Sequence, residues 1–78
     1  MEEFLEFVIK GLVDHPDEVV IMRLDSEKKT VFTVQVLPAD IGKVIGKHGQ
    51  TIEALRSVLS AGAARIGRQV ILEIDDQS

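Results

Sequence analysis

The sequence contains no cysteine, no tryptophan and no tyrosine, and only three of its 78 residues are phenylalanine. The lack of cysteine excludes a disulfide framework and any zinc site built on thiolates. No apolar run approaches the roughly 20 residues that a membrane-spanning helix needs. The first residues are acidic where a secretory leader would be basic. We therefore expect a cytoplasmic protein without a membrane partner.

The chain is also too short to enclose a deep active-site cavity, because a single domain of 78 residues buries only a modest share of its surface. Its histidines, His15 and His48, fall on separate predicted loops without a carboxylate or cysteine at ligand spacing. No Ser-His-Asp or Cys-His arrangement can be assembled. These absences predict one domain over residues 1–78 with no catalytic residues, no metal site and no cofactor, and hence a protein that is not an enzyme.

The net charge of −4 argues by itself against nucleic-acid binding, which depends on clustered lysine and arginine. The charge is unevenly distributed, however. Residues 39–68 hold five basic and two acidic side chains and carry +3, so the remainder of the chain carries −7. This asymmetry is typical of a polyanion-binding face on an acidic body, although a few basic residues on a solvated helix would give the same count.

Apolar periodicity predicts helices over residues 2–13, 39–45 and 50–66, and strands over residues 18–24, 31–37 and 68–74. A polar turn joins the first two strands, which we expect to pair antiparallel. Residues 75–78 are polar, and we expect this tail to fray. The order α-β-β-α-α-β predicts an α+β domain in which three helices pack on one face of a three-stranded sheet.

Several side chains are predicted to form the core. The last helix carries apolar residues at spacings of three and four, namely Ile52, Leu55, Leu59, Ala63 and Ile66. Alternation in the second strand places Phe32, Val34 and Val36 on one face. We also expect Phe4 and Phe7, the remaining aromatic residues, to lie in or near the core.

The segment IGKVIGKHGQTIEAL, residues 41–55, contains a short turn between two predicted helices. The turn consists of Gly46, Lys47, His48 and Gly49. Its glycines permit a close approach that a Cβ would prevent, and the helix that follows presents free N–H groups to an anion. Lys47 adds a positive charge and His48 adds a hydrogen-bond donor. The turn therefore has the features of a phosphate-binding loop.

This segment resembles the core of a KH domain with residues 46–49 as its GXXG loop, and the element order is similar to the type II form of that fold. The whole chain resembles one family, the small single-domain bacterial KhpA-type RNA-binding proteins. The resemblance implies that the loop binds the backbone of about four nucleotides of single-stranded RNA, while bases lie in an adjoining apolar groove. That groove would be lined by Val44, Ile45 and Ile52, with Val34 and Val36 opposite, and some of these side chains must also serve the core.

Two further basic residues flank the loop. Lys43 precedes it by one helical turn, and it either contacts the same RNA backbone or is an ordinary surface lysine. Arg56 lies one turn beyond Ile52, and it either meets RNA or pairs with Glu53 or Asp40. Both belong to the candidate RNA-binding set.

The last predicted helix carries a second stripe of mostly small residues, rotated away from its core stripe: Ala54, Val58, Ala61, Gly62 and Arg65. Small apolar residues would let another helix come close, so we predict a protein-binding face here. The resemblance implies two partners for such a face, a second copy of the chain or a larger KH protein of the KhpB type, also called Jag or EloR. The alternative is a surface rich in alanine only because alanine favours helix formation.

The sequence thus predicts a type II KH domain that binds single-stranded RNA with modest affinity. The resemblance implies an RNA chaperone or post-transcriptional regulator, with a role in cell-wall synthesis and cell shape in some bacteria. A protein-interaction module of the same fold without RNA binding is the alternative, and the net charge of −4 keeps it open.

Overall fold

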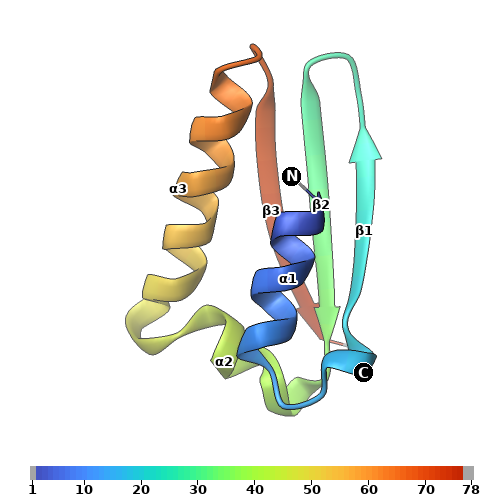
Figure 1. Cartoon of the computed structure of the whole chain (residues 1–78), viewed down its shortest axis with the longest axis vertical. Coiled ribbons are helices and arrows are strands. Elements are labelled where there is room, and N and C mark those ends of the chain that lie inside the picture. Colours follow the sequence, from blue (N-terminus) through green and yellow to red (C-terminus); the bar gives the residue numbers. More distant parts are fainter. Residues whose placement is uncertain (1, 77–78) are drawn as a thin grey trace.

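The computed structural model describes residues 2–76, in which three helices and three strands follow the predicted order (Figure 1). In chain order the elements are α1 (Glu2–Leu12), β1 (Val20–Asp25), β2 (Lys29–Val36), α2 (Ile41–Ile45), α3 (Gln50–Ala64) and β3 (Gln69–Asp76). Short 3₁₀ turns cover Pro16–Glu18, Pro38–Asp40 and Lys47–Gly49. The α+β class and the type II KH order predicted from the sequence are confirmed. No helix in this described range is long and apolar enough to cross a membrane.

The sheet has the order β1-β2-β3, with β2 in the centre. Strand β1 pairs antiparallel with β2, as predicted, and β3 pairs parallel with β2 on its other side. All three helices lie on one face of this sheet, with α3 alongside β3 (Figure 1). The strand beside α3 is therefore β3, an edge strand, and not the central strand β2.

The core is a single apolar layer between the sheet and the helices. Alternation in β2 directs Phe32, Val34 and Val36 into this layer, as predicted, because successive side chains of a strand point to opposite faces. The helices and β3 complete the layer with Leu5, Ile9, Val44, Ile52, Leu55, Leu59 and Leu72. The opposite face of the sheet is open, and Val20, Met22 and Leu24 of β1 are exposed there.

The prediction that Ile66 of the last helix belongs to the core is wrong. Ile66 is 67% exposed, because α3 ends at Ala64 and the chain turns before Ile66 can reach the core. The Gly67 N–H donates to the Ala64 carbonyl and the Arg68 N–H donates to the Ala63 carbonyl. This is the Schellman pattern that a glycine with positive φ permits, and Gly67 has a φ of 71°.

The predicted positions of two aromatic residues and of the C-terminal tail also need correction. Phe4 is 45% and Phe7 80% exposed, because α1 buries Leu5 and Ile9 on its other side. Strand β3 continues to Asp76, paired with β2, so the tail predicted to fray from Asp75 does not begin there. Residues 77–78 lie outside the described residues.

The β1–β2 hairpin lies at the opposite end of the molecule from the turn between α2 and α3 (Figure 1). Its tip is tied to the α3–β3 turn, since the Gln69 N–H donates to the Lys28 carbonyl at 2.8 Å. The Arg68 guanidinium donates to the Ser26 and Lys29 carbonyls and to Thr30 Oγ1. The hairpin is therefore a natural control region for any function of the α2–α3 turn.

The contrast between Leu59 and Ile66 gives a direct test of the core. Leu59 is 2% exposed, so Leu59→Ala should lower the free energy of unfolding by about 2–5 kcal/mol. Ile66→Ala should cost less than about 1 kcal/mol, because most of that side chain is already in water. Urea unfolding followed by circular dichroism measures both values. Equal losses would show that α3 continues to Ile66 and contradict the observed helix end.

Candidate functional site

The GXXG loop, Gly46–Gly49, begins where α2 ends. The Gly46 N–H closes the helix by donating to the Gly42 carbonyl at 2.9 Å. Gly46 then adopts φ 78° and ψ 175°, a combination that is open almost only to glycine. A Cβ at this position would lie 2.7 Å from Thr51 Cβ, so only glycine lets α2 approach the first turn of α3 this closely.

The second half of the loop is left-handed. His48 has φ 56° and ψ 25°, and Gly49 has φ 74° and ψ 10°. Left-handed backbone is costly for a residue with a Cβ, and such conformations cluster at functional sites. His48 is the only residue other than glycine with positive φ in the described range 2–76. The turn brings the Lys47 and His48 side chains to the surface, where both are exposed.

The loop leads directly into the N-terminus of α3. Its N-cap residue is Gly49, which has no side chain to bond the first N–H groups of the helix. These N–H groups, together with the helix dipole, attract negative charge. Lys47 belongs to the turn that directly precedes these N–H groups in the sequence. A turn of this geometry is suited to a phosphate or another anion.

The predicted apolar groove needs correction. Val44 is fully buried and Ile52 is only 6% exposed, so both belong to the core and support the loop from beneath. Val34 and Val36 are fully buried on the central strand and cannot face a ligand. Ile45 is half-buried and is the predicted groove residue that still reaches the surface. Ile52, Val34 and Val36 also belong to the predicted core, and that part of the prediction is confirmed. The sequence could not show that burial leaves Ile45 as the predicted groove residue at the surface.

Arg56 bridges α3 and the edge strand. Its Nε and Nη2 donate to the Leu72 carbonyl at 3.3 and 3.1 Å. This contact replaces the predicted pairing with Glu53 or Asp40. It satisfies a carbonyl of β3 that has no neighbouring strand on that side. Arg56 therefore links α3 to β3, and part of its side chain remains exposed.

Lys43 lies on α2 and forms an ion pair with Asp14, in the segment between α1 and β1. The hydrogen bond that the Lys43 ammonium donates to Asp14 Oδ2 raises the pKa of Lys43, with burial acting in the opposite direction. Lys43 therefore remains charged, but its ammonium group is already paired with Asp14. Lys47 lies in the loop itself and is exposed. Among the ion pairs of the described residues, none includes Lys47, so its charge is available to a ligand.

Asp40 is the residue that the sequence reading missed. It is 1% exposed, and its Oδ2 accepts a hydrogen bond from the His15 backbone N–H at 3.1 Å. His15 Nδ1 lies 3.1 Å from the same oxygen. An ionised carboxylate only accepts, so Nδ1 must carry the proton. The two residues lie 25 positions apart, and no sequence pattern links them.

Burial by itself would raise the pKa of Asp40. Hydrogen bonds from the His15 side chain and from the His15 backbone N–H, together with the nearby backbone N–H of Asp14, outweigh it and hold the pKa below its ordinary value. A carboxyl group with a lowered pKa stabilises the fold above the pKa that it has in the unfolded chain. This contribution is therefore complete at neutral pH and is lost as the pH falls through the acidic range.

The predicted protein-binding stripe is exposed along its whole length, from Ala54 to Arg65. Ala54 and Val58 line a groove of about 400 Å³ between α1 and α3, together with Phe4, Val8 and Leu12 of α1. Gln50 and Thr51, at the start of α3, form the end of the same groove. The sequence reading found the α3 half of this surface and missed the α1 half, because it assigned Phe4 to the core.

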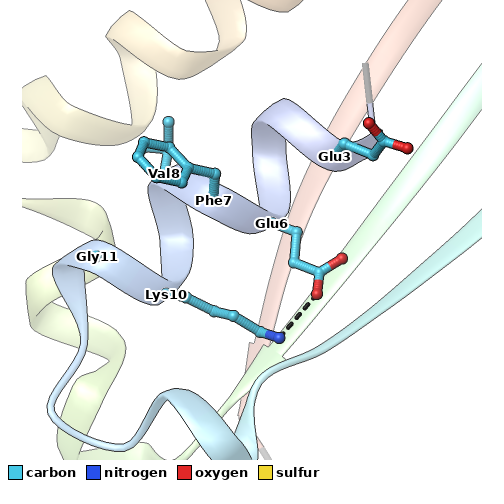
Figure 2. Close-up of a pocket in the computed structure, with 6 residues that line it drawn as sticks. All are labelled: Glu3, Glu6, Phe7, Val8, Lys10 and Gly11. Atoms are coloured by element: carbon cyan, nitrogen blue, oxygen red, sulfur yellow. Dashed lines mark hydrogen bonds and ion pairs between the residues drawn. The ribbon is translucent and has the colours of Figure 1, made fainter.

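A second depression on α1 continues this apolar surface (Figure 2). Its lining includes Phe7 and Val8, while Glu6 and Lys10 extend along another side of the helix and form an ion pair at 2.7 Å (Figure 2). Exposed aromatic rings beside a shallow groove are typical of protein-interaction surfaces. Over residues 2–76 no group of three or more histidine, cysteine or carboxylate side chains is placed to hold a metal ion.

The chain was also compared with known proteins. Residues 2–74 match the family model described as "KhpA/KhpB, KH domain". The chain is 43% identical over 77 residues to a protein of Chlamydia pneumoniae, an alignment that covers 99% of each chain. It is 43% identical over 74 residues to a protein of Borreliella burgdorferi, covering 95% of this chain and 90% of the relative.

A third relative, from Thermotoga maritima, is 49% identical over 61 residues, which cover 78% of this chain and 81% of the relative. All three relatives carry the name "RNA-binding protein KhpA". No solved structure gives a significant match to this chain. The similarity therefore rests on sequence, and it extends over nearly the whole chain.

The three glycines around the loop should differ in their tolerance of alanine. Gly46→Ala should lower the melting temperature most, because the new Cβ meets Thr51 and the φ of 78° is strained. Gly49→Ala meets no atom within 4 Å, so only its positive φ opposes it, at a cost of about 1–2 kcal/mol. Gly42→Ala lies in α2 without a close neighbour and should be neutral or slightly stabilising. Thermal unfolding ranks the variants, and equal effects at Gly42 and Gly46 would refute the close approach to Thr51.

Proposed function

The chain belongs to the KhpA/KhpB family of KH domains, and on that premise we propose that it binds single-stranded RNA through the GXXG loop. The observation that carries this proposal is the loop itself: two glycines with positive φ, an exposed Lys47 and His48, and an uncapped helix N-terminus in one turn. Each relative compared above is named an RNA-binding protein. The proposed ligand atoms at the loop are backbone phosphates, because phosphate oxygens are common partners of lysine and of the N–H groups at a helix N-terminus.

We assign different roles to the remaining predicted RNA-binding residues. Ile45 is the apolar side chain available for a base beside the loop, while Val44 and Ile52 support the loop from the core. Lys43 would contribute charge at a distance, since it is paired with Asp14. Arg56 could exchange its contact with the Leu72 carbonyl for a contact with a base or a phosphate. With few free cations and no aromatic platform at the loop, binding should be weak for one domain.

We also propose that the groove between α1 and α3 binds a protein partner, a second copy of this chain or a KhpB-type KH protein. Val58 is 54% exposed and lies beside Ala54 on α3, and Phe4 and Val8 face the same groove from α1. Ala61, Gly62 and Arg65 would extend the contact along α3. Linking two weak RNA sites in one assembly would raise their combined affinity without any new RNA contact.

The wider role follows from these two proposals and from the family resemblance. We propose a non-enzymatic cytoplasmic RNA chaperone or post-transcriptional regulator, in some settings connected with cell-wall synthesis and cell shape. A KH-fold protein-interaction module without RNA binding is the competing function. The net charge of −4 and the burial of most of the predicted groove favour it, so the first experiment must distinguish the two.

Reversing the charge of the loop tests RNA binding. The double variant Lys47→Asp, His48→Asp should weaken binding of a fluorescently labelled single-stranded RNA by about tenfold or more in fluorescence anisotropy. Both side chains are exposed, so folding should be retained. In the wild type, each phosphate contact should add about −0.7 to the slope of log affinity against log salt, giving about −1.4 for two contacts.

The matched control is Lys28→Asp, Lys29→Asp, which reverses two charges on the hairpin at the opposite end of the molecule (Figure 1). It changes the net charge at least as much as the loop variant. If both double variants lose affinity equally, the effect is one of net charge and the loop is not the site. If neither loses affinity, or if the wild type binds no RNA, the protein-interaction function is favoured.

Adding charge to the groove between α1 and α3 tests the partner surface. We expect the wild type to form a dimer in analytical ultracentrifugation, and Val58→Glu or Ala61→Glu to shift it to a monomer, because a buried unpaired carboxylate opposes association. Met22→Glu, on the open face of the sheet, is the control and should leave the dimer unchanged. A wild type that is monomeric at all concentrations would refute the homodimer, and a dimer unaffected by Val58→Glu would refute this surface.

A further inference from the structure

The GXXG loop follows α2, a helix that is too short to be stable by itself. Helix α2 has five residues, and its last residue, Ile45, directly precedes Gly46. Isolated helices much shorter than about 12–15 residues are unstable in water, because helix nucleation is unfavourable. Contacts with the rest of the domain must therefore fix α2. One such contact is apolar, since Val44 is fully buried in the core.

The second contact is polar and lies at the start of α2. Asp40 immediately precedes the helix, yet its carboxylate forms no capping bond to the helix N–H groups. It accepts instead from the His15 backbone N–H and lies 3.1 Å from His15 Nδ1. His15 belongs to the segment that connects α1 to β1, so this buried carboxylate joins two segments that are distant in sequence.

A third contact reinforces the same connection. Asp14, the neighbour of His15, pairs with Lys43 in the middle of α2. The segment after α1 therefore contacts Asp40, just before α2, and Lys43, within α2, while Gly46, just after α2, lies close to Thr51 of α3. Helix α2 is thus held at its start, its middle and its end.

We propose that Asp40 and His15 are positioning residues for the GXXG loop. By fixing the start of α2, they set the position in which Gly46 packs against Thr51 and Lys47 and His48 reach the surface. The Asp14–Lys43 ion pair assists them, but both of its side chains are largely exposed and exposed pairs contribute little. This inference rests on the proposed RNA binding by the loop.

The test compares Asp40→Ala with Thr30→Val. Thr30 is also buried and polar, with hydrogen bonds to Asp25 and Arg68, but it lies at the hairpin end of the molecule. Both variants should lower the melting temperature. Below both melting temperatures, Asp40→Ala should weaken binding of the labelled single-stranded RNA by about three- to tenfold, whereas Thr30→Val should stay within about twofold of the wild type. Equal losses in the two variants would overturn the proposal.

Amide hydrogen exchange provides a readout that needs no RNA. In Asp40→Ala, exchange of the Gly46 and Gly49 N–H groups, which donate to the Gly42 and Gly46 carbonyls, should become faster than in Thr30→Val. Asp40→Asn keeps an oxygen for the His15 N–H and should recover most of the protection and affinity. His15→Ala, which removes only the side-chain contact, replaces Asp40→Ala if that variant does not fold, and its effects should have the same direction but be smaller, because the His15 N–H contact remains.

The outcomes separate the two proposals. If the wild type binds no RNA, the proposed function fails. Faster exchange at Gly46 and Gly49 in Asp40→Ala than in Thr30→Val would still support positioning of the loop. If the wild type binds RNA and the loop variant does not, but Asp40→Ala and His15→Ala bind as tightly as the wild type, only the positioning role is overturned. Unchanged exchange at Gly46 and Gly49 in both variants would overturn it as well.

Discussion

Burial of one apolar layer between the sheet and the helices is the interaction on which the rest of this structure depends. The domain has two layers and a single core, so the three helices, β2 and β3 each have one side in the core, while β1 contributes the half-buried Ile21. Helix α3 contributes Ile52, Leu55 and Leu59 to that layer, and its first turn is thereby fixed against the core, where Ile52 is buried. The end of the GXXG loop is fixed with it, because α3 begins at the residue after Gly49.

The loop also shows how a small domain can hold a strained turn. Positive φ at His48 would be unfavourable in a free peptide, because His48 carries a Cβ, whereas Gly46 and Gly49 adopt positive φ readily. Here α3 fixes one end of the turn and α2 fixes the other, and α2 is itself held by Val44 in the core and by Asp40 at its start. The result is a preformed group of N–H donors and basic side chains, and a preformed site loses less free energy on ordering when a ligand binds.

Much of this fold could be predicted from the sequence, because its signals are local. Alternation identified the buried face of β2, and the glycines identified the loop. The errors arose where burial depends on distant parts of the chain. Periodicity extended α3 to Ile66, which the turn at Gly67 leaves in solvent, and it could not tell that Val44 is covered while Phe4 and Phe7 are exposed. The contact between His15 and Asp40 joins residues far apart in sequence, so only the folded chain shows it.

The central claim is that the GXXG loop binds single-stranded RNA, and titration of the ¹⁵N-labelled protein with such an RNA tests it most directly. We predict that the amide signals of residues 46–51 shift progressively and that those of the β1–β2 hairpin do not. The signals of Phe4, Phe7 and Val58, on the proposed partner surface, should remain where they were in the RNA-free assembly. A spectrum unchanged at residues 46–51 at saturating RNA, or shifts confined to the hairpin or to the partner surface, would contradict the account.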